Sequence, residues 1–98
     1  MANVSDLDAW IDESIRISSK HNYHPNVFQN MRRLHGTVGA IEKLVISGDI
    51  QSGFRRLKEL GLLQWTIEQA VLSFPEDFPN PEVRQAAQWR LDQARAER

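Results

Sequence analysis

Cysteine is absent from this chain of 98 residues, and its absence excludes disulfide bridges, thiolate nucleophiles and zinc sites with cysteine ligands. Long apolar runs are missing too, because the longest, such as 44–46, are far shorter than the ~18 residues that suggest a membrane span. Neither sign of charge is in excess: 12 Lys and Arg stand against 13 Asp and Glu, for a net charge of -1. A near-neutral protein is not expected to show tight, non-specific binding of nucleic acid.

The first residues, 1–11, contain no Lys or Arg and no long apolar segment, so they lack both parts of a secretory signal. We therefore expect a cytoplasmic protein that has no contact with a membrane. What is present is the composition of a small folded protein, with 41% hydrophobic and 26% charged residues. The length suits one domain, which we expect to span residues 1–98.

Apolar residues recur at helical spacing along most of the chain, and no stretch alternates apolar and polar residues as a half-buried strand does. The expected helical segments are bounded by residues that cap or stop helices, namely Ser5, Pro25, Gly36, Thr37, Gly48, Ser52, Gly61, Gln64, Pro75 and Asn80. The predicted fold class is all-α, a single compact bundle of five or six short helices. Within it we expect an N-terminal helix over 1–20, a core over 24–91 and a fraying end over 92–98.

Part of the sequence resembles a small bacterial helical domain to which no activity is attached. The matching segments are Tyr23-His24-Pro25, Thr37-Val38-Gly39-Ala40, Ser52-Gly53-Phe54-Arg55-Arg56-Leu57, Gly61-Leu62, Thr66-Ile67-Glu68 and Val71-Leu72. The chain departs from the pattern at Gln64, where members of that domain family tend to have aspartate. The resemblance covers about 24–91; it implies a helical fold and a bacterial or phage source, and it transfers no site residue.

The basic residues gather in the middle of the chain. Residues 21–61 hold six basic against three acidic residues, a local charge of +3, whereas 1–20 and 62–98 each carry -2. Such a positive segment can meet an anionic surface, either phosphate or the acidic face of a protein, or it can simply be a solvated polar face.

The segment 52–72 has the outline of a helix-turn-helix, with a glycine turn between two expected helices. A recognition helix should present Arg, Lys, Asn or Gln to base edges, but its charged residue here is Glu68, which phosphate repels. Sequence-specific DNA binding is therefore disfavoured.

Catalytic and metal-binding motifs are not found in the sequence. It has no Gly-x-Ser-x-Gly, no phosphate-binding glycine loop and no His-Glu-x-x-His. His21 and His24 are close in sequence, but Pro25 places them around a turn, and the third histidine, His35, lies at the far end of the next segment. We expect no catalytic residue, no metal and no cofactor.

These observations predict a non-catalytic helical module for protein–protein interaction, an adaptor, regulator or inhibitor of a bacterium or its phage. Its partner would be another protein or a second copy of the chain. Tryptophan is frequent at binding hot spots, although for each of the three tryptophans taken singly a place in the core is favoured. The expected partner-binding residues are Tyr23, His24, Arg32, Arg33, Arg55, Arg56 and Trp65. The alternative is a nucleic-acid-binding accessory protein that uses 21–61.

Overall fold

The N-terminal helix, α1 (Asp6–Lys20), carries acidic residues in its first turn and a lysine in its last, as the helix dipole favours. The computed structural model describes residues 6–47 and 52–96. The buried residues of α1 are Leu7, Ile11, Ser14 and Ser18, spaced by four, three and four positions along one face. Two of these four are serines, so the inner face of α1 becomes polar toward its C-terminal end.

The second helix, α2 (Asn26–Ile46), consists of two helical segments that meet at Gly36. The backbone there has φ 79° and ψ 168°, a conformation that glycine adopts far more easily than residues with a side chain. The predicted break at Gly36 is therefore confirmed. Thr37, which we expected to cap the following segment, instead accepts a hydrogen bond from Arg32 and donates one to Asp8.

The chain continues through α3 (Ser52–Glu59), the short 3-10 turn η1 (Leu63–Trp65) and α4 (Ile67–Ser73). The Thr66 hydroxyl accepts a hydrogen bond from the Gln69 backbone N–H (3.2 Å) and so caps α4. The helix expected to open near Gln64 thus opens after Thr66, and Trp65 lies in the turn before it.

A second 3-10 turn, η2 (Pro75–Asp77), leads into the last helix, α5 (Pro81–Ala96). The Asn80 side-chain oxygen accepts a hydrogen bond from the Glu82 backbone N–H (2.9 Å), as its predicted role as an N-cap requires. The predicted fraying over 92–98 stays a prediction; α5 continues to Ala96, and Ala94 is buried in a small cluster with Phe54 and Leu91.

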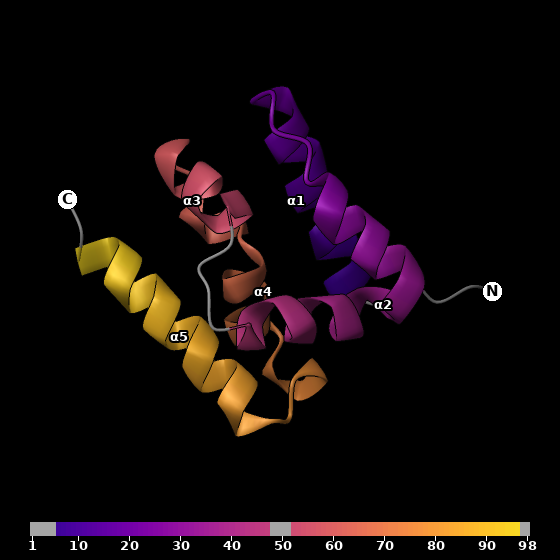
Figure 1. Cartoon of the computed structure of the whole chain (residues 1–98), viewed down its shortest axis with the longest axis vertical. Helices are drawn as coiled ribbons and strands as arrows, with labels where there is room; N and C mark the ends of the chain where they lie inside the picture. The colour runs from indigo at the N-terminus through magenta and orange to yellow at the C-terminus, as the bar shows by residue number, and fades with distance from the viewer. Residues whose placement is uncertain (1–5, 48–51, 97–98) are drawn as a thin grey trace.

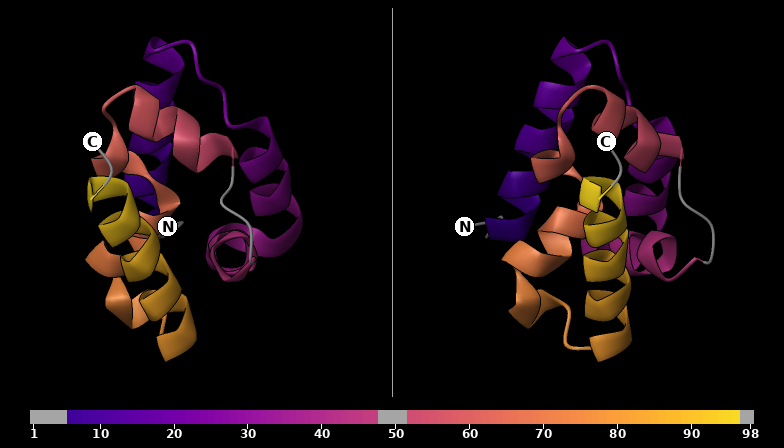
Figure 2. Two further views of the ribbon diagram at one scale, coloured as in Figure 1. Left: turned by 60° about the vertical axis from the view of Figure 1, so that its left-hand side comes forward. Right: turned by 90° about the vertical axis from the view of Figure 1, so that its left-hand side faces the viewer.

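The short helix α4 lies at the centre of the arrangement (Figure 1). It contacts α5, the second segment of α2 crosses close to both, and α1 packs against α4 from the other side. Two further views show α5 running beside α4 (Figure 2). The helix α3 sits above α4 in Figure 1, near one end of α5.

One main core joins α1, α2, α4 and α5. Its buried residues are Leu7, Ile11, Phe28, Ala40, Ile41, Val45, Ala70, Val71, Phe78, Val83 and Ala87. Five α-helices and no strand are found among residues 6–47 and 52–96, so the prediction of an all-α bundle is confirmed. The predicted cap Ser5 and the predicted stop Gly48 lie outside the described residues.

Candidate functional site

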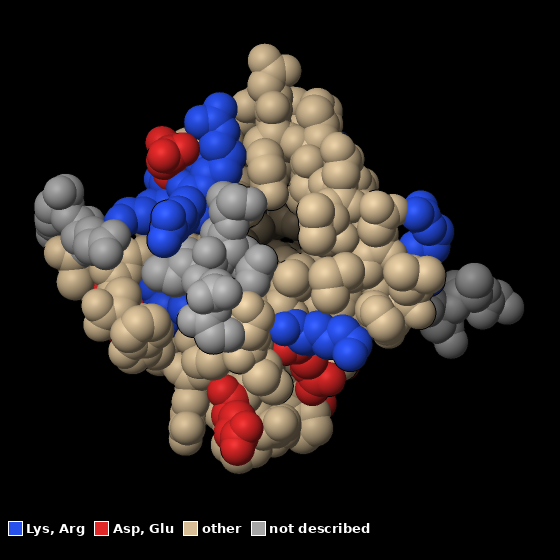
Figure 3. Space-filling model, in the orientation of Figure 1, with Lys and Arg blue, Asp and Glu red and all other residues tan. Residues whose placement is uncertain are grey.

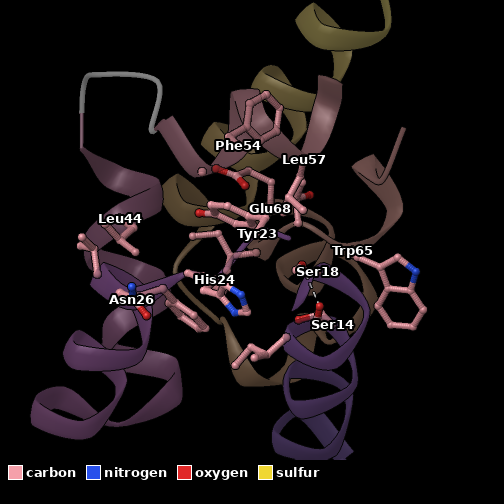
Figure 4. A pocket seen from close by; sticks show the side chains of 17 residues that line it. Ser14, Ser18, Tyr23, His24, Asn26, Leu44, Phe54, Leu57, Trp65 and Glu68 are labelled. Carbon is pink, nitrogen blue, oxygen red and sulfur yellow. Dashed lines mark hydrogen bonds between the residues drawn. The ribbon is translucent and has the colours of Figure 1, made fainter. Parts of the chain in front are cut away.

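A cavity of about 380 Å³ lies between α1, the α1–α2 turn, both segments of α2, α3 and the start of α4. A hollow is visible near the centre of the face in Figure 3. Figure 4 shows the lining side chains from close by. The volume of this cavity lies within the range of about 300–1,000 Å³ that is usual for ligand-binding pockets.

Most of the cavity wall is apolar. Ile15, Phe28, Leu44, Phe54, Leu57 and Ile67 contribute aliphatic and aromatic surface. The buried serines of α1 also line the cavity, but their hydroxyls are already used: Ser14 donates to the Ile11 carbonyl and Ser18 to the Ser14 carbonyl, each at 2.8 Å. A hydroxyl that bonds to its own helix adds little polarity to the wall.

One charged group lines the cavity among the described residues, Glu68, which α4 carries on its inner face. Its side chain is 1% exposed, and its Oε2 accepts a hydrogen bond from Arg90 Nη1 of α5 at 2.8 Å. Arg90 is itself 5% exposed and also donates to the backbone carbonyls of Leu44 and Ser47, at the end of α2. The pair therefore connects α4, α5 and α2 in the interior.

Only one oxygen of the Glu68 carboxyl group is used in this way. Oε1 is buried and has no hydrogen-bond partner among the residues that the structure describes. Burial raises the pKa of Glu68 above the usual value for a carboxyl group, against the opposing effect of Arg90. A buried acceptor without a donor is costly.

Two of the predicted partner-binding residues, Tyr23 and His24, also line the cavity. The Tyr23 ring reaches across to α3, where a side chain on Gly53 would place its Cβ 2.4 Å from Tyr23 Oη. Burial raises the pKa of the Tyr23 hydroxyl. His24 is exposed at the edge, and its Nδ1 lies 3.2 Å from the Ser19 hydroxyl.

The contact between Tyr23 and Gly53 gives a prediction whose sign depends on the background. In the wild type, Gly53→Ala should lower the free energy of unfolding by about 1–2 kcal/mol, because the Tyr23 hydroxyl must move. In a Tyr23→Phe background the nearest ring atom, Cζ, lies 3.5 Å from the new Cβ, which is an ordinary contact. There Gly53→Ala should raise the free energy of unfolding by up to about 1 kcal/mol, because alanine has the higher helix propensity. Urea denaturation of the four proteins measures both effects; equal effects in the two backgrounds would contradict the prediction.

Trp65, a third predicted partner-binding residue, belongs partly to a cluster of aromatic rings. Its ring centroid lies 5.1 Å from that of Trp10, and Trp10 lies 6.2 Å from Phe74 in an edge-on arrangement. In Figure 4 the indole of Trp65 points away from the cavity that the residue borders. Trp65 thus joins η1 to α1.

Arg32 is held by α1. Its guanidinium donates to Asp12 Oδ1 (2.7 Å), to Asp8 Oδ1 (3.1 Å) and to the Thr37 hydroxyl (2.8 Å). Burial lowers the pKa of Arg32, but the hydrogen bonds to Asp12 and Asp8 outweigh this effect and raise it. A side chain with three such partners within the fold has little capacity left for a partner protein.

The other predicted arginines are exposed but do not form one patch with Arg32. Arg33 lies on α2 and contacts Asn30, whereas Arg55 and Arg56 lie on α3, where Arg56 Nη1 is 3.4 Å from Glu59 Oε1. Figure 3 shows the Lys and Arg side chains of this face in separate groups. The structure therefore divides the basic segment of the sequence among several elements.

The segment with the outline of a helix-turn-helix has its second helix in the interior. The residues of α4 that are buried include Glu68, Ala70 and Val71. A recognition helix must have an exposed face long enough to enter the major groove. A helix as short and as buried as α4 does not offer such a face.

A metal site in this protein would need three or more His, Asp or Glu side chains close together. No such cluster is found among residues 6–47 and 52–96. Ser19 and His24 form a hydroxyl–imidazole pair, but it is exposed, and no carboxylate among the described residues is hydrogen-bonded to His24. The pair thus lacks the third group that orients the base in a catalytic triad.

Sequence reasoning missed Glu68 and Arg90 as members of a site. The signal was a charged residue on an otherwise apolar helix face: Arg90 lies three positions after Ala87 and seven after Val83, both buried. Trp89, one of the three tryptophans that the sequence left open between the core and an interface, has a side chain that is 58% exposed. Ser14 and Ser18 continue the spacing of Leu7 and Ile11, which was a readable sign of burial.

Comparison with protein-family models, with curated proteins and with solved structures gives no match. The resemblance of 24–91 to a bacterial helical domain, and the source that it implies, therefore remain predictions. No helix within the described parts of the chain combines the length and the apolar character needed to cross a membrane.

Proposed function

We propose that this protein is a non-catalytic binding module that accepts an apolar group of a protein partner in the cavity between α1, α2, α3 and α4. The single observation that carries the proposal is the cavity itself, about 380 Å³ in volume and walled mainly by apolar side chains. Burial of an apolar group there would contribute about 25 cal/mol for each Å² removed from water.

A protein is favoured as the partner because exposed apolar side chains continue from the cavity along α2. Val27 lines the cavity and is 69% exposed, and Leu34, two turns further along the same segment, is 76% exposed. Residues seven positions apart lie on one face of a helix. A partner that fills the cavity with one side chain can cover this face with its neighbours, which a small molecule cannot.

The chemistry of the cavity supports binding rather than catalysis. Ser14 and Ser18 donate their hydroxyl protons to backbone carbonyls, and Glu68 is paired with Arg90. No nucleophile within the described residues lies in hydrogen-bond contact with a base that a third group orients. These features favour a module that recognises its partner without changing it.

Selection from a phage-displayed library of random peptides tests the proposal. Peptides that bind the wild type should share an apolar side chain. Val27→Glu should weaken them at least about tenfold, because it places a charge at the edge of the cavity and removes apolar contact. Trp89→Glu is the matched control, since Trp89 is exposed on α5, which contributes no residue to the cavity.

The opposite pattern would overturn the proposal. Peptides that bind the Val27→Glu protein as tightly as the wild type, and that lose affinity with Trp89→Glu, would place the binding surface on α5. Failure to enrich any peptide that shares an apolar residue would also count against the cavity.

The nucleic-acid alternative gains less from the structure. Arg32 is paired with Asp8 and Asp12, and Arg56 with Glu59, so part of the positive charge of 21–61 is balanced within the fold. Duplex or single-stranded DNA that bound more tightly than about 100 μM in low salt, with an affinity that fell steeply as salt rose, would favour that alternative.

A further inference from the structure

The charged residue in the wall of the cavity, Glu68, carries a hydrogen-bond acceptor that is not satisfied among the residues that the structure describes. Glu68 Oε1 is buried and has no partner within the described residues, while Oε2 accepts from Arg90 at 2.8 Å. The carboxyl group is seen at the upper part of the cavity in Figure 4, in view between Phe54 and Tyr23. A group that enters the cavity therefore gains most if it carries a donor toward Oε1.

The charge of the surroundings determines what kind of donor fits. Glu68 and Arg90 together are neutral, and their side chains are 1% and 5% exposed. An ammonium or guanidinium group at Oε1 would bring a second positive charge close to Arg90 in a buried, apolar environment, which is unfavourable. A neutral N–H donor satisfies the same oxygen without adding charge.

The shape and chemistry of the walls favour a ring. Tyr23, Phe28 and Phe54 line the cavity, together with aliphatic side chains. Aromatic groups pack well against one another in offset or edge-to-face arrangements. A flat aromatic body that carries one N–H group matches both the walls and this buried acceptor.

We infer that the cavity binds an aromatic group with one neutral N–H donor, the chemistry of the indole ring, and that Glu68 Oε1 accepts the hydrogen bond from that N–H. The inference rests on the proposed function, because it names the group that the partner inserts. It makes Glu68 the residue that determines specificity, while the apolar walls supply affinity.

A comparison of two isosteric probes tests this assignment. Indole and benzofuran have the same outline, but benzofuran has an oxygen in place of the N–H. Indole should bind the wild-type protein at least about tenfold more tightly, because only indole can donate to the buried carboxyl group. The dissociation constants are measured by NMR titration, which follows the backbone amides of Tyr23 and Glu68 and reports binding at the cavity.

Glu68→Gln is the matching variant. The amide oxygen of the glutamine can still accept a hydrogen bond from Arg90, and its NH₂ group then points toward the cavity. Because this group donates and does not accept, the preference for indole over benzofuran should disappear or invert. Glu59→Gln, on the exposed side of α3, should leave the preference unchanged. The comparison of indole with benzofuran on the wild type remains decisive if Glu68→Gln fails to fold.

N-acetyl-tryptophan amide distinguishes the two sources of an indole group. A tryptophan side chain of a protein is the occupant if two results hold. The amide binds about as well as indole, and Val27→Glu weakens the binding of the amide but not that of indole. If indole binds and the amide is excluded, a free indole compound is the ligand; the inference then stands and the proposed protein partner is refuted.

Two further outcomes separate the inference from the function on which it rests. Equal affinities for indole and benzofuran at the cavity would overturn the role of Glu68, while the proposed binding of an apolar group would stand. No response of the cavity amides to either compound at millimolar concentrations would overturn both, because fragments of this size bind a preformed site within that range.

Discussion

Arg90→Met should lower the free energy of unfolding by about 3–5 kcal/mol at neutral pH, as is usual when one partner of a buried ion pair is removed. The substitution leaves Glu68 without its donor, and it also removes the hydrogen bonds that Arg90 gives to the Leu44 and Ser47 carbonyls. Urea denaturation followed by circular dichroism measures the loss. The exposed Arg33, changed to Met in the same way, should alter stability by less than about 0.5 kcal/mol.

The loss should depend on pH with a defined sign. Burial already raises the pKa of Glu68, so Glu68 favours the folded state most in acid, and this contribution is lost as the pH rises through its pKa in the folded protein. In Arg90→Met the pKa rises further, because the group that favours the charged form is gone. The variant should therefore be closest to the wild type in acid, and the difference should grow as the pH rises.

A double variant controls for the shape of the side chains. Glu68→Leu combined with Arg90→Met removes both charges and should recover about 2 kcal/mol relative to Arg90→Met alone. Recovery will be partial, because the carbonyls of Leu44 and Ser47 still lack the donor that Arg90 supplied. An Arg90→Met protein as stable as the wild type at all pH values would show that the ion pair does not form in the interior.

Phe78→Ala should cost about 3–5 kcal/mol, the usual loss when a fully buried aromatic ring is truncated. Phe78 is 0% exposed and is the largest fully buried side chain, although it lies in the link between η2 and α5. Thermal or urea unfolding measures the change. Phe74→Ala, between α4 and η2 at a partly buried position, should cost roughly 1–2 kcal/mol. Equal losses for the two variants would contradict the position of Phe78 in the core.

Helical spacing and capping residues were enough to predict the arrangement of the chain into helices. Gly36 breaks α2 and Asn80 caps α5 because glycine conformation and capping bonds are local properties that sequence displays directly. The burial of Phe78 was not predictable in this way. The link that carries it has no helical periodicity, and its position depends on how α4 and α5 come together.

The candidate site was predictable only in part. Tyr23 and His24 were predicted to be partner-binding residues, and both line the cavity, while their role in binding stays a prediction. Glu68 and Arg90 are 22 residues apart and on different helices, so their pairing depends on tertiary packing. The same reason applies to Arg32, which the sequence offers as a free cation and which α1 neutralises.

The kink at Gly36 has a consequence for the selectivity of the cavity. Val27 and Leu44 line the same cavity from opposite sides of the kink, so the angle between the two segments of α2 determines how far apart the walls stand. Arg32 and Thr37 hold the segments on each side of Gly36 to Asp8 of α1. For the binding proposed above, the conformation at Gly36 and the contacts of Arg32 and Thr37 with Asp8 contribute to the size of group that fits, although none of these residues lines the cavity.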